Sequence, residues 1–422
     1  MLVGSRNGAR LWWLLGALVR VAAVLVIVVV LHRKHFHLGV LMVAAAAIIG
    51  LLFGMRPQQI AVNALASVFS ASTLSVVGAM AFVGLLEALM NRAGMLDLAL
   101  RSLSALVRDR RVIVGVVPAF MGLLPSAGGA LMSCPMVDGA CASLELSPHR
   151  RALANYWYRH VTEFIVPVYP AFVLASQISG VSVRSLAAWS APAGLIAAAV
   201  MAPAVFKGVP RSAAVLPTQE GTDRRSALCG LILGTAPIAV VVALVVACQW
   251  SVLAAVACVV LGLAVVRFPG WELLVQMIRS SFLSKTCGMA LGIMLFKDML
   301  SAVGAVDEIA GYITAIGAPA AVTAVVLPLL LGAVTGMNSA AVGVAFPIIS
   351  GLFSLSGGLA PQMAALAYIA SVVGILITPM HLCMVVTADY FRADIGEMLR
   401  AVLAPAAAVL CWGILVSMLW RH

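Results

Sequence analysis

Residues 319–351 read PAAVTAVVLPLLLGAVTGMNSAAVGVAFPIISG, and this stretch indicates how the chain folds. It is apolar and long enough to enter a bilayer, but Pro328 and the polar turn around Asn338 interrupt its middle. A membrane tolerates irregular backbone only where that backbone is buried in protein or lines a wet cavity. The stretch therefore predicts a re-entrant hairpin inside a membrane protein.

The composition of the whole chain also predicts a membrane protein. Hydrophobic residues make up 63% of the 422 residues and charged residues only 10%, with a mean hydropathy of +1.12. Soluble domains carry about 25% charged residues, so this chain is too poor in charge to cover a soluble globule. The net charge of +11 does not indicate binding to nucleic acid, because the Lys and Arg residues occupy short loops, where they orient membrane helices.

About ten apolar runs are candidates to cross a bilayer, which takes about 20 residues per helix. They lie near 11–31, 38–54, 71–91, 155–178, 184–206, 227–248, 251–267, 282–302, 364–387 and 401–420. The bias of Lys and Arg among the loops predicts a multi-pass protein of the cell inner membrane with both termini outside. Lys285 is either deep, if 271–302 spans directly, or interfacial, if 271–281 lies flat.

The two halves of the chain repeat one another, mainly at Gly and Pro. At offsets of 210 to 212 residues, the matches are Gly50 and Gly262, Pro57 and Pro269, Gly78 and Gly288, Gly94 and Gly304, Pro118 and Pro328, Gly122 and Gly332, Pro135 and Pro347, Tyr156 and Tyr368, Pro167 and Pro379. Residues 92–111 carry five Arg, whereas 303–318 carry no Lys or Arg, so corresponding loops lie on opposite sides of the membrane. We therefore expect an all-α polytopic membrane protein built from two inverted five-helix repeats, an arrangement typical of secondary transporters.

Each repeat has a re-entrant hairpin and a broken helix, and these four breaks predict the binding site. Glycine lets backbone approach a ligand, and helix N-termini favour anions, so a small anionic solute is the expected ligand. The expected substrate-binding residues are Ser126, Gly128, Gly129, Ser133, Tyr169, Thr335, Asn338, Ser339 and Thr378. Helix packing is the alternative for any single cluster of small residues, but four breaks in two-fold register favour a site.

Ionisable residues within spans are candidates for function. His160 and Glu163 are three residues apart and so share a helix face, and His381 lies beside the break in the ninth span. We expect these three side chains to relay protons or to recognise the head group of the solute. The alternative is a polar network with Arg159 that only positions the break.

Three strings of the sequence resemble a known membrane family, called domain of unknown function 401. They are Gly122-Leu-Leu-Pro125-Ser-Ala-Gly128-Gly129-Ala130, Asn155-Tyr-Trp157-Tyr-Arg159-His160-Val-Thr-Glu163, and Thr378-Pro379-Met-His381-Leu382-Cys383 running on to Thr387. That family is placed with the ion transporter superfamily, which includes dicarboxylate and citrate carriers. The Ser-Asn-Thr tip motif of the sodium-dicarboxylate carriers is absent at the first tip, so sodium coupling and dicarboxylate substrates do not carry over.

The resemblance implies a homodimer with elevator-type movement of a transport domain against a scaffold. It places scaffold helices at 1–92 and 227–303, connectors at 93–111 and 304–318, and transport-domain halves at 112–208 and 319–422, with a polar cytoplasmic linker at 209–226.

The sequence thus predicts a secondary transporter coupled to protons or sodium, with no other cofactor, no bound metal and no enzyme activity. A membrane-embedded enzyme is the first alternative, with His160, Glu163 and His381 as a metal set of two histidines and one carboxylate. A passive channel or a subunit of a larger complex is the second. The identity of the solute, import against export, and symport against antiport stay open.

Overall fold

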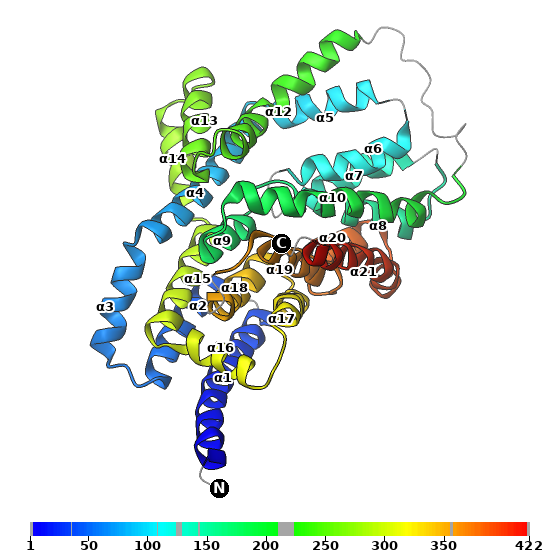
Figure 1. Cartoon of the computed structure of the whole chain (residues 1–422). Helices are drawn as coiled ribbons and strands as arrows, with labels where there is room; N and C mark the ends of the chain where they lie inside the picture. Colours follow the sequence, from blue (N-terminus) through cyan, green and yellow to red (C-terminus); the bar gives the residue numbers. More distant parts are fainter. Residues whose placement is uncertain are drawn as a thin grey trace. The chain divides into compact units, whose positions relative to one another are not determined.

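The computed structural model describes residues 3–34, 36–107, 109–123, 129–141, 144–209, 223–354 and 358–419. Within these ranges the regular structure consists of α-helices and one 3₁₀ turn, and no strand occurs among them (Figure 1). The all-α class expected from the sequence is therefore confirmed for the described part of the chain.

The two halves of the described chain contain corresponding helices in the same order along the sequence. The first half contains α1 (Val3–Arg33), α2 (Leu38–Leu52), α3 (Pro57–Val68), α4 (Ala71–Arg92), α5 (Met95–Leu106), α6 (Arg110–Met121), α7 (Gly129–Cys141), α8 (Pro148–Val161), the 3₁₀ turn η1 (Thr162–Phe164), α9 (Pro170–Ser179) and α10 (Val183–Phe206). The second half contains α12 (Arg224–Val246), α13 (Val252–Val266), α14 (Trp271–Phe282), α15 (Lys285–Ala302), α16 (Ala305–Ala315), α17 (Ala320–Thr335), α18 (Asn338–Ser354), α19 (Pro361–Leu376), α20 (Leu382–Phe391) and α21 (Ile395–Leu419).

Five of the described helices are long and apolar enough to cross a membrane, which makes this a membrane protein. They are Leu15–Arg33, Ala71–Arg92, Val183–Phe206, Arg224–Val246 and Ile395–Leu419. The segment Trp271–Ala302 passes the same test together with Ala305–Ala315, bent by 68°. Of the other runs predicted as spans, 38–54 and 251–267 form shorter apolar helices, and 155–178 and 364–387 are each broken into two helices.

Glycines end the fourth helix of each half at equivalent positions. Gly94 follows α4 with φ 65°, and Gly304 follows α15 with φ 71°. This left-handed conformation is disfavoured for residues with a Cβ atom, so the repeated glycines separate the long helices from the short helices α5 and α16.

The helix around Lys285 is interrupted, so 271–302 is not one continuous helix. The helix α14 ends at Phe282, and the Ser284 side chain then caps α15 by accepting from the backbone N–H of Cys287 at 3.2 Å. A serine at this position satisfies one of the N–H groups that a helix start leaves without a partner. Lys285 is the first residue of α15 and is exposed.

The described chain divides into two compact units. Unit 1 comprises Met1–Ala81, Pro170–Ser182 and Phe282–Ile375. Within it α2 packs along α15, α1 packs on α16, and α17 and α18 form a hairpin that also contacts α9 (Figure 1). Close backbone packing needs glycine here: a Cβ added to Gly332 of α17 would lie 2.6 Å from the Ser371 carbonyl oxygen of α19.

Unit 2 comprises Phe82–Tyr169, Val183–Ser281 and Leu376–His422. Within it α5 packs on α12, α10 packs on α21, and α8 contacts α6, α7, α10 and α20. A Cβ on Gly122, at the end of α6, would collide with the Arg159 carbonyl oxygen and the Thr162 hydroxyl. The helix α8 is thus the central element of unit 2.

Candidate functional site

The helix α8 carries polar side chains but is buried on every side. Ser147 caps its start and Pro148 occupies its first turn, where the missing N–H is not needed. From Ala152 to Val161 every residue is buried, and Asn155, Arg159 and His160 are 0%, 3% and 1% exposed. Burying polar and charged groups costs free energy unless they find partners, so the polar side chains of this helix need partners within unit 2.

The first break begins where α8 ends. Residues Thr162–Phe164 form a 3₁₀ turn, and α9 begins only at Pro170. Pro167 and Pro170 have no N–H group to continue the helix. The second break is similar, because α19 ends at Leu376, Pro379 follows, and α20 begins at Leu382.

Two histidines meet across these breaks within unit 2. The Nε2 atoms of His160 and His381 are 2.8 Å apart, and their ring centroids are 4.8 Å apart. The Nδ1 atom of His160 lies 2.7 Å from the carbonyl oxygen of Tyr156. A carbonyl oxygen can only accept, so Nδ1 carries a hydrogen, and Nε2 faces His381 Nε2.

Glu163 and Cys383 complete this cluster. The Oε1 atom of Glu163 is 3.8 Å from His160 Nε2. The ligand atoms of His160, His381 and Cys383 all lie within 4.8 Å of one another. The structure therefore brings together the three side chains expected for coupling and adds a thiol. The sequence analysis did not assign a role to Cys383, although the spacing His381-x-Cys383 directly after a helix break was a usable signal.

Tyrosines connect the cluster to both breaks. Tyr156 donates from its hydroxyl to the Leu376 carbonyl at 3.1 Å, and its ring lies 5.0 Å from that of His160. Tyr169 is buried and donates to the Gly122 carbonyl, and its hydroxyl is 3.3 Å from that of Thr162. Tyr156 thus holds the backbone before the second break, and Tyr169, which lies within the first break, connects that break to the end of α6.

A second, neutral polar cluster lies between the helices α7, α8 and α20 of unit 2. Ser133 donates to Asn155 Oδ1 at 2.6 Å, and Asn155 Nδ2 donates to the Ala130 carbonyl at 3.0 Å and to Thr387 Oγ1 at 3.1 Å. Ser133 was expected at the site, whereas Asn155 and Thr387 were not singled out from the sequence. The sequence signal that could have identified them was an amide in α8, one turn before Arg159, and a hydroxyl in the largely apolar helix α20.

The predicted residues of the first hairpin tip fall largely outside the described part of the chain. Ser126 and Gly128 lie outside the described residues, and Gly129 is the first residue of α7. Their expected role in substrate binding stays a prediction.

The second hairpin tip belongs to unit 1. Thr335 ends α17, where its hydroxyl donates to the Leu331 carbonyl at 2.7 Å and accepts from the Met337 N–H at 3.2 Å. Asn338 and Ser339 begin α18 and are each 8% exposed, and Asn338 Oδ1 accepts from the Ser371 hydroxyl of α19 at 2.7 Å. A neutral amide and hydroxyls therefore surround this turn.

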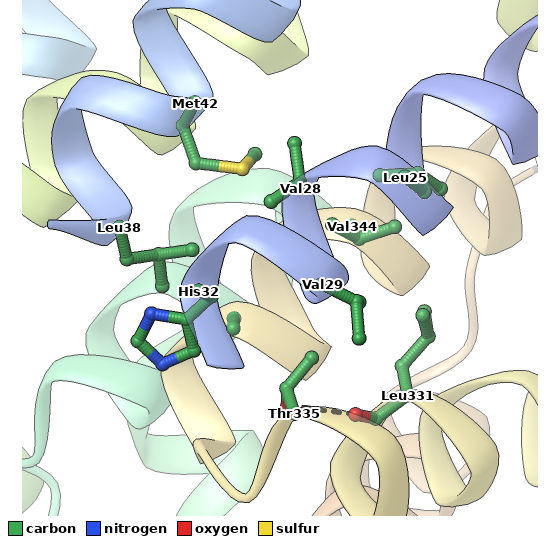
Figure 2. Close-up of a pocket in the computed structure, with 10 residues that line it drawn as sticks. Leu25, Val28, Val29, His32, Leu38, Met42, Leu331, Thr335 and Val344 are labelled. Carbon is green, nitrogen blue, oxygen red and sulfur yellow. Dashed lines mark hydrogen bonds between the residues drawn. The ribbon is translucent and has the colours of Figure 1, made fainter. Parts of the chain in front are cut away.

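A small cavity of about 20 Å³ adjoins Thr335. Figure 2 shows the side chains of His32, Met42 and Val344 around it, with the Thr335 hydroxyl turned to Leu331. The volume accommodates about one water-sized molecule, and the lining is almost wholly aliphatic. This cavity is too small for an organic anion.

Thr378 lies in the second break and in unit 2. It is buried, and its hydroxyl accepts from the backbone N–H of Met380 at 3.2 Å. This short-range bond stabilises the non-helical turn before His381. Of the predicted residues, unit 2 thus holds Gly129, Ser133, His160, Glu163, Tyr169, Thr378 and His381, and unit 1 holds Thr335, Asn338 and Ser339.

Comparison with known proteins places the chain in a family. Residues 15–419 match the family described as "Protein of unknown function (DUF401)". The chain belongs to this family. The match covers both halves of this DUF401 chain, including both breaks and the His160–His381 cluster. Among curated proteins none matches it.

A solved transporter shares the fold of this DUF401 protein. The crystal structure of the YdaH transporter of Alcanivorax borkumensis aligns with a TM-score of 0.58 and 15% sequence identity, over 90% of this chain and 96% of that chain. At this identity the likeness concerns the fold. It covers nearly the full length of both proteins, so the helix order is shared as a whole rather than in one segment.

Proposed function

We propose that this protein is a cation-coupled secondary transporter of a small anionic solute. The observation that carries the proposal is the fold shared with a transporter along 90% of the chain. The recurring helix order supports it, because α8–α9 and α19–α20 are both broken helices at equivalent positions. Broken helices that meet in internal repeats are how many secondary transporters build their sites.

The proposed architecture follows the sequence prediction. Ten spans form two inverted repeats with a re-entrant hairpin in each, in the inner membrane and with both termini outside. The scaffold and transport domains lie within the bounds given above, the transport domain moves as an elevator, and the protein is a homodimer. The difference of charge between 92–111 and 303–318 supports the inversion.

The proposed site consists of the breaks and hairpin tips. Neutral hydroxyls, amides and helix N-termini contact the anion, with Ser126, Gly128, Gly129, Ser133, Tyr169, Thr335, Asn338, Ser339 and Thr378 as the assigned residues. His160, Glu163 and His381 serve cation coupling or recognition of the head group. Burial of His160 and Glu163 next to a break supports this assignment, since ionisable groups within membrane helices commonly mark ion and substrate pathways.

The first test is a thermal-shift screen of the purified protein in detergent. Succinate, citrate, sulfate, methylphosphonate and isethionate are each added in sodium or potassium buffer, at an acidic and a neutral pH. A ligand of the folded state stabilises it by about 2.7 kcal/mol at a hundredfold excess over its dissociation constant. At least one anion is expected to raise the melting temperature, with a dependence on sodium or on pH that identifies the coupling cation.

The second test is uptake of the stabilising anion, in labelled form, into proteoliposomes. Uptake driven by a sodium or proton gradient supports the proposal. Uptake that depends on neither gradient contradicts cation coupling and indicates a passive channel. If none of the anions stabilises the protein, the assignment of an anionic solute is wrong.

A further inference from the structure

Three side chains of unit 2 present nitrogen or sulfur ligand atoms to a common point. The ligand atoms of His160, His381 and Cys383 lie within 4.8 Å of one another, and the two Nε2 atoms are 2.8 Å apart. Zinc binds histidine at about 2.0–2.1 Å and thiolate at about 2.3 Å, so tetrahedral ligand atoms are separated by about 3.3–3.8 Å. The observed spacing brackets that range, and His381 and Cys383 are partly exposed, so small rotations suffice to reach it.

The orientation of His160 is that of a metal ligand. Histidines that bind metals commonly donate their second ring N–H to a carbonyl or carboxylate, which fixes the tautomer. His160 does this through Nδ1, 2.7 Å from the Tyr156 carbonyl oxygen. Its Nε2 lies 2.8 Å from His381 Nε2, so the two nitrogens either share a hydrogen or can both bind one cation.

A carboxylate lies beside this group of three, next to His160. Glu163 Oε1 is 3.8 Å from His160 Nε2, and Glu163 is 7% exposed. A thiolate and a carboxylate together offset the charge of a divalent ion, which lowers the cost of burying that ion. The nitrogen and sulfur donors select a borderline metal over Mg²⁺ or Ca²⁺, which prefer oxygen ligands.

We propose that His160, His381 and Cys383, with Glu163 as fourth ligand, form a zinc site. This departs from the absence of a metal expected from the sequence. His160 and Glu163 lie at the end of α8 and in η1, and His381 and Cys383 at the start of α20. Zinc at this point would tie the two helix breaks of unit 2 together.

Cobalt provides a direct test, because Co²⁺ replaces Zn²⁺ in such sites and its absorption reports the ligands. The full-length protein in detergent is treated with a chelator, freed of it and titrated with Co²⁺. One equivalent is expected to bind, with a thiolate-to-cobalt band in the near ultraviolet and visible bands typical of tetrahedral coordination. Zn²⁺ should then displace the cobalt and remove both signals.

Variants identify the ligands. Cys383→Ser should remove the thiolate band, and His160→Gln should weaken Co²⁺ binding about tenfold or more. Cys411→Ser is the matched control, because Cys411 is an exposed cysteine on α21, and it should leave the spectrum unchanged. A band that survives Cys383→Ser, or loss of the band in Cys411→Ser, would place the metal elsewhere. No stoichiometric binding by the folded wild-type protein would overturn the site.

The consequence for transport rests on the proposed function and is separate from binding. Since the same side chains are assigned to coupling or head-group recognition, Zn²⁺ should inhibit uptake in wild-type proteoliposomes but not in Cys383→Ser, provided that this variant still transports. Cobalt binding without any transport would contradict the proposed function alone. Transport without cobalt binding would contradict the zinc site alone.

Discussion

The helices α8 and α19 occupy the same place in the two halves of the chain but have opposite character. At an offset of 212 residues, Asn155, Arg159, His160 and Glu163 of the first half correspond to Ala367, Ser371, Val372 and Ile375 of the second. Both helices precede a break and both are buried. The two helices share Tyr156 and Tyr368, and the small or aliphatic pairs Ala152 and Ala364, and Val161 and Val373.

The difference between the two helices separates features that support the fold from features of the candidate site. Close packing is kept in both halves, because Gly122 and Gly332 each bring backbone against the helix that precedes the break. Of these two helices, only α8 with its 3₁₀ turn carries histidine, arginine or glutamate. The cluster becomes complete because His381 and Cys383 come from the start of α20 in the second half. Matched variants test this comparison.

The largest effect is expected at the shared glycine contact. In Gly332→Ala the new Cβ lies 2.6 Å from the Ser371 carbonyl oxygen, which cannot move without displacing α19. Such overpacking costs about 3 kcal/mol, so the melting temperature in detergent should fall clearly, and Gly122→Ala should behave in the same way. Gly262→Ala is the control, because nothing lies within 4 Å of its added Cβ. An equal loss in Gly262→Ala would refute the packing argument.

The next effect concerns the amide that only α8 carries. Asn155→Ala removes a partner from Ser133, Thr387 and the Ala130 carbonyl at once, all of them buried. Losing these buried hydrogen bonds together costs about 2 kcal/mol, while Ser133 keeps its bond to the Ala130 carbonyl at 3.1 Å. Ser371→Ala in α19 removes the bond to Asn338 and should cost less, about 1 kcal/mol. Chemical or thermal denaturation in detergent measures both, and the reverse order would show that the polar cluster of α8 is not the more tightly bonded.

The smallest effect on stability is expected at the paired tyrosines. Tyr156→Phe loses the hydrogen bond to the Leu376 carbonyl at the second break and should cost about 1 kcal/mol. Because its ring also contacts His160, this variant should slow gradient-driven uptake more than Tyr368→Phe does. Equal rates in the two variants would mean that the position of Tyr156 beside the histidines has no bearing on transport.

Much of the fold follows from the sequence because backbone breaks need special residues. Gly94 and Gly304 adopt left-handed conformations, and the prolines of the breaks cannot continue a helix, so these residues predicted where two long helices end and where both broken helices are interrupted. The short helix α3 was not expected, since its 12 residues are too few to be recognised as a membrane span. The interruption at Ser284 is a local capping effect that hydropathy alone does not resolve.

The candidate site was predicted less completely, for a physical reason. His160, Glu163 and His381 stand out because ionisable groups are costly in a membrane helix. Cys383, Asn155 and Thr387 are small and common in apolar helices, so only their positions in space distinguish them. Residues 160 and 381 are far apart in sequence, and the register between α8 and α20 depends on side-chain packing rather than on any local pattern.

Gradient-driven uptake in a matched pair of histidine variants tests the central claim most directly. His160 and His149 both belong to α8, but His149 lies at its start, 3.9 Å from Glu397 and away from the breaks. Wild type, His160→Gln and His149→Gln are reconstituted into proteoliposomes, and uptake of the stabilising anion is measured with and without a cation gradient. The account predicts that His160→Gln folds but loses gradient-driven uptake, whereas His149→Gln keeps it. Equal gradient-driven uptake by the two variants would contradict a functional site at the helix breaks.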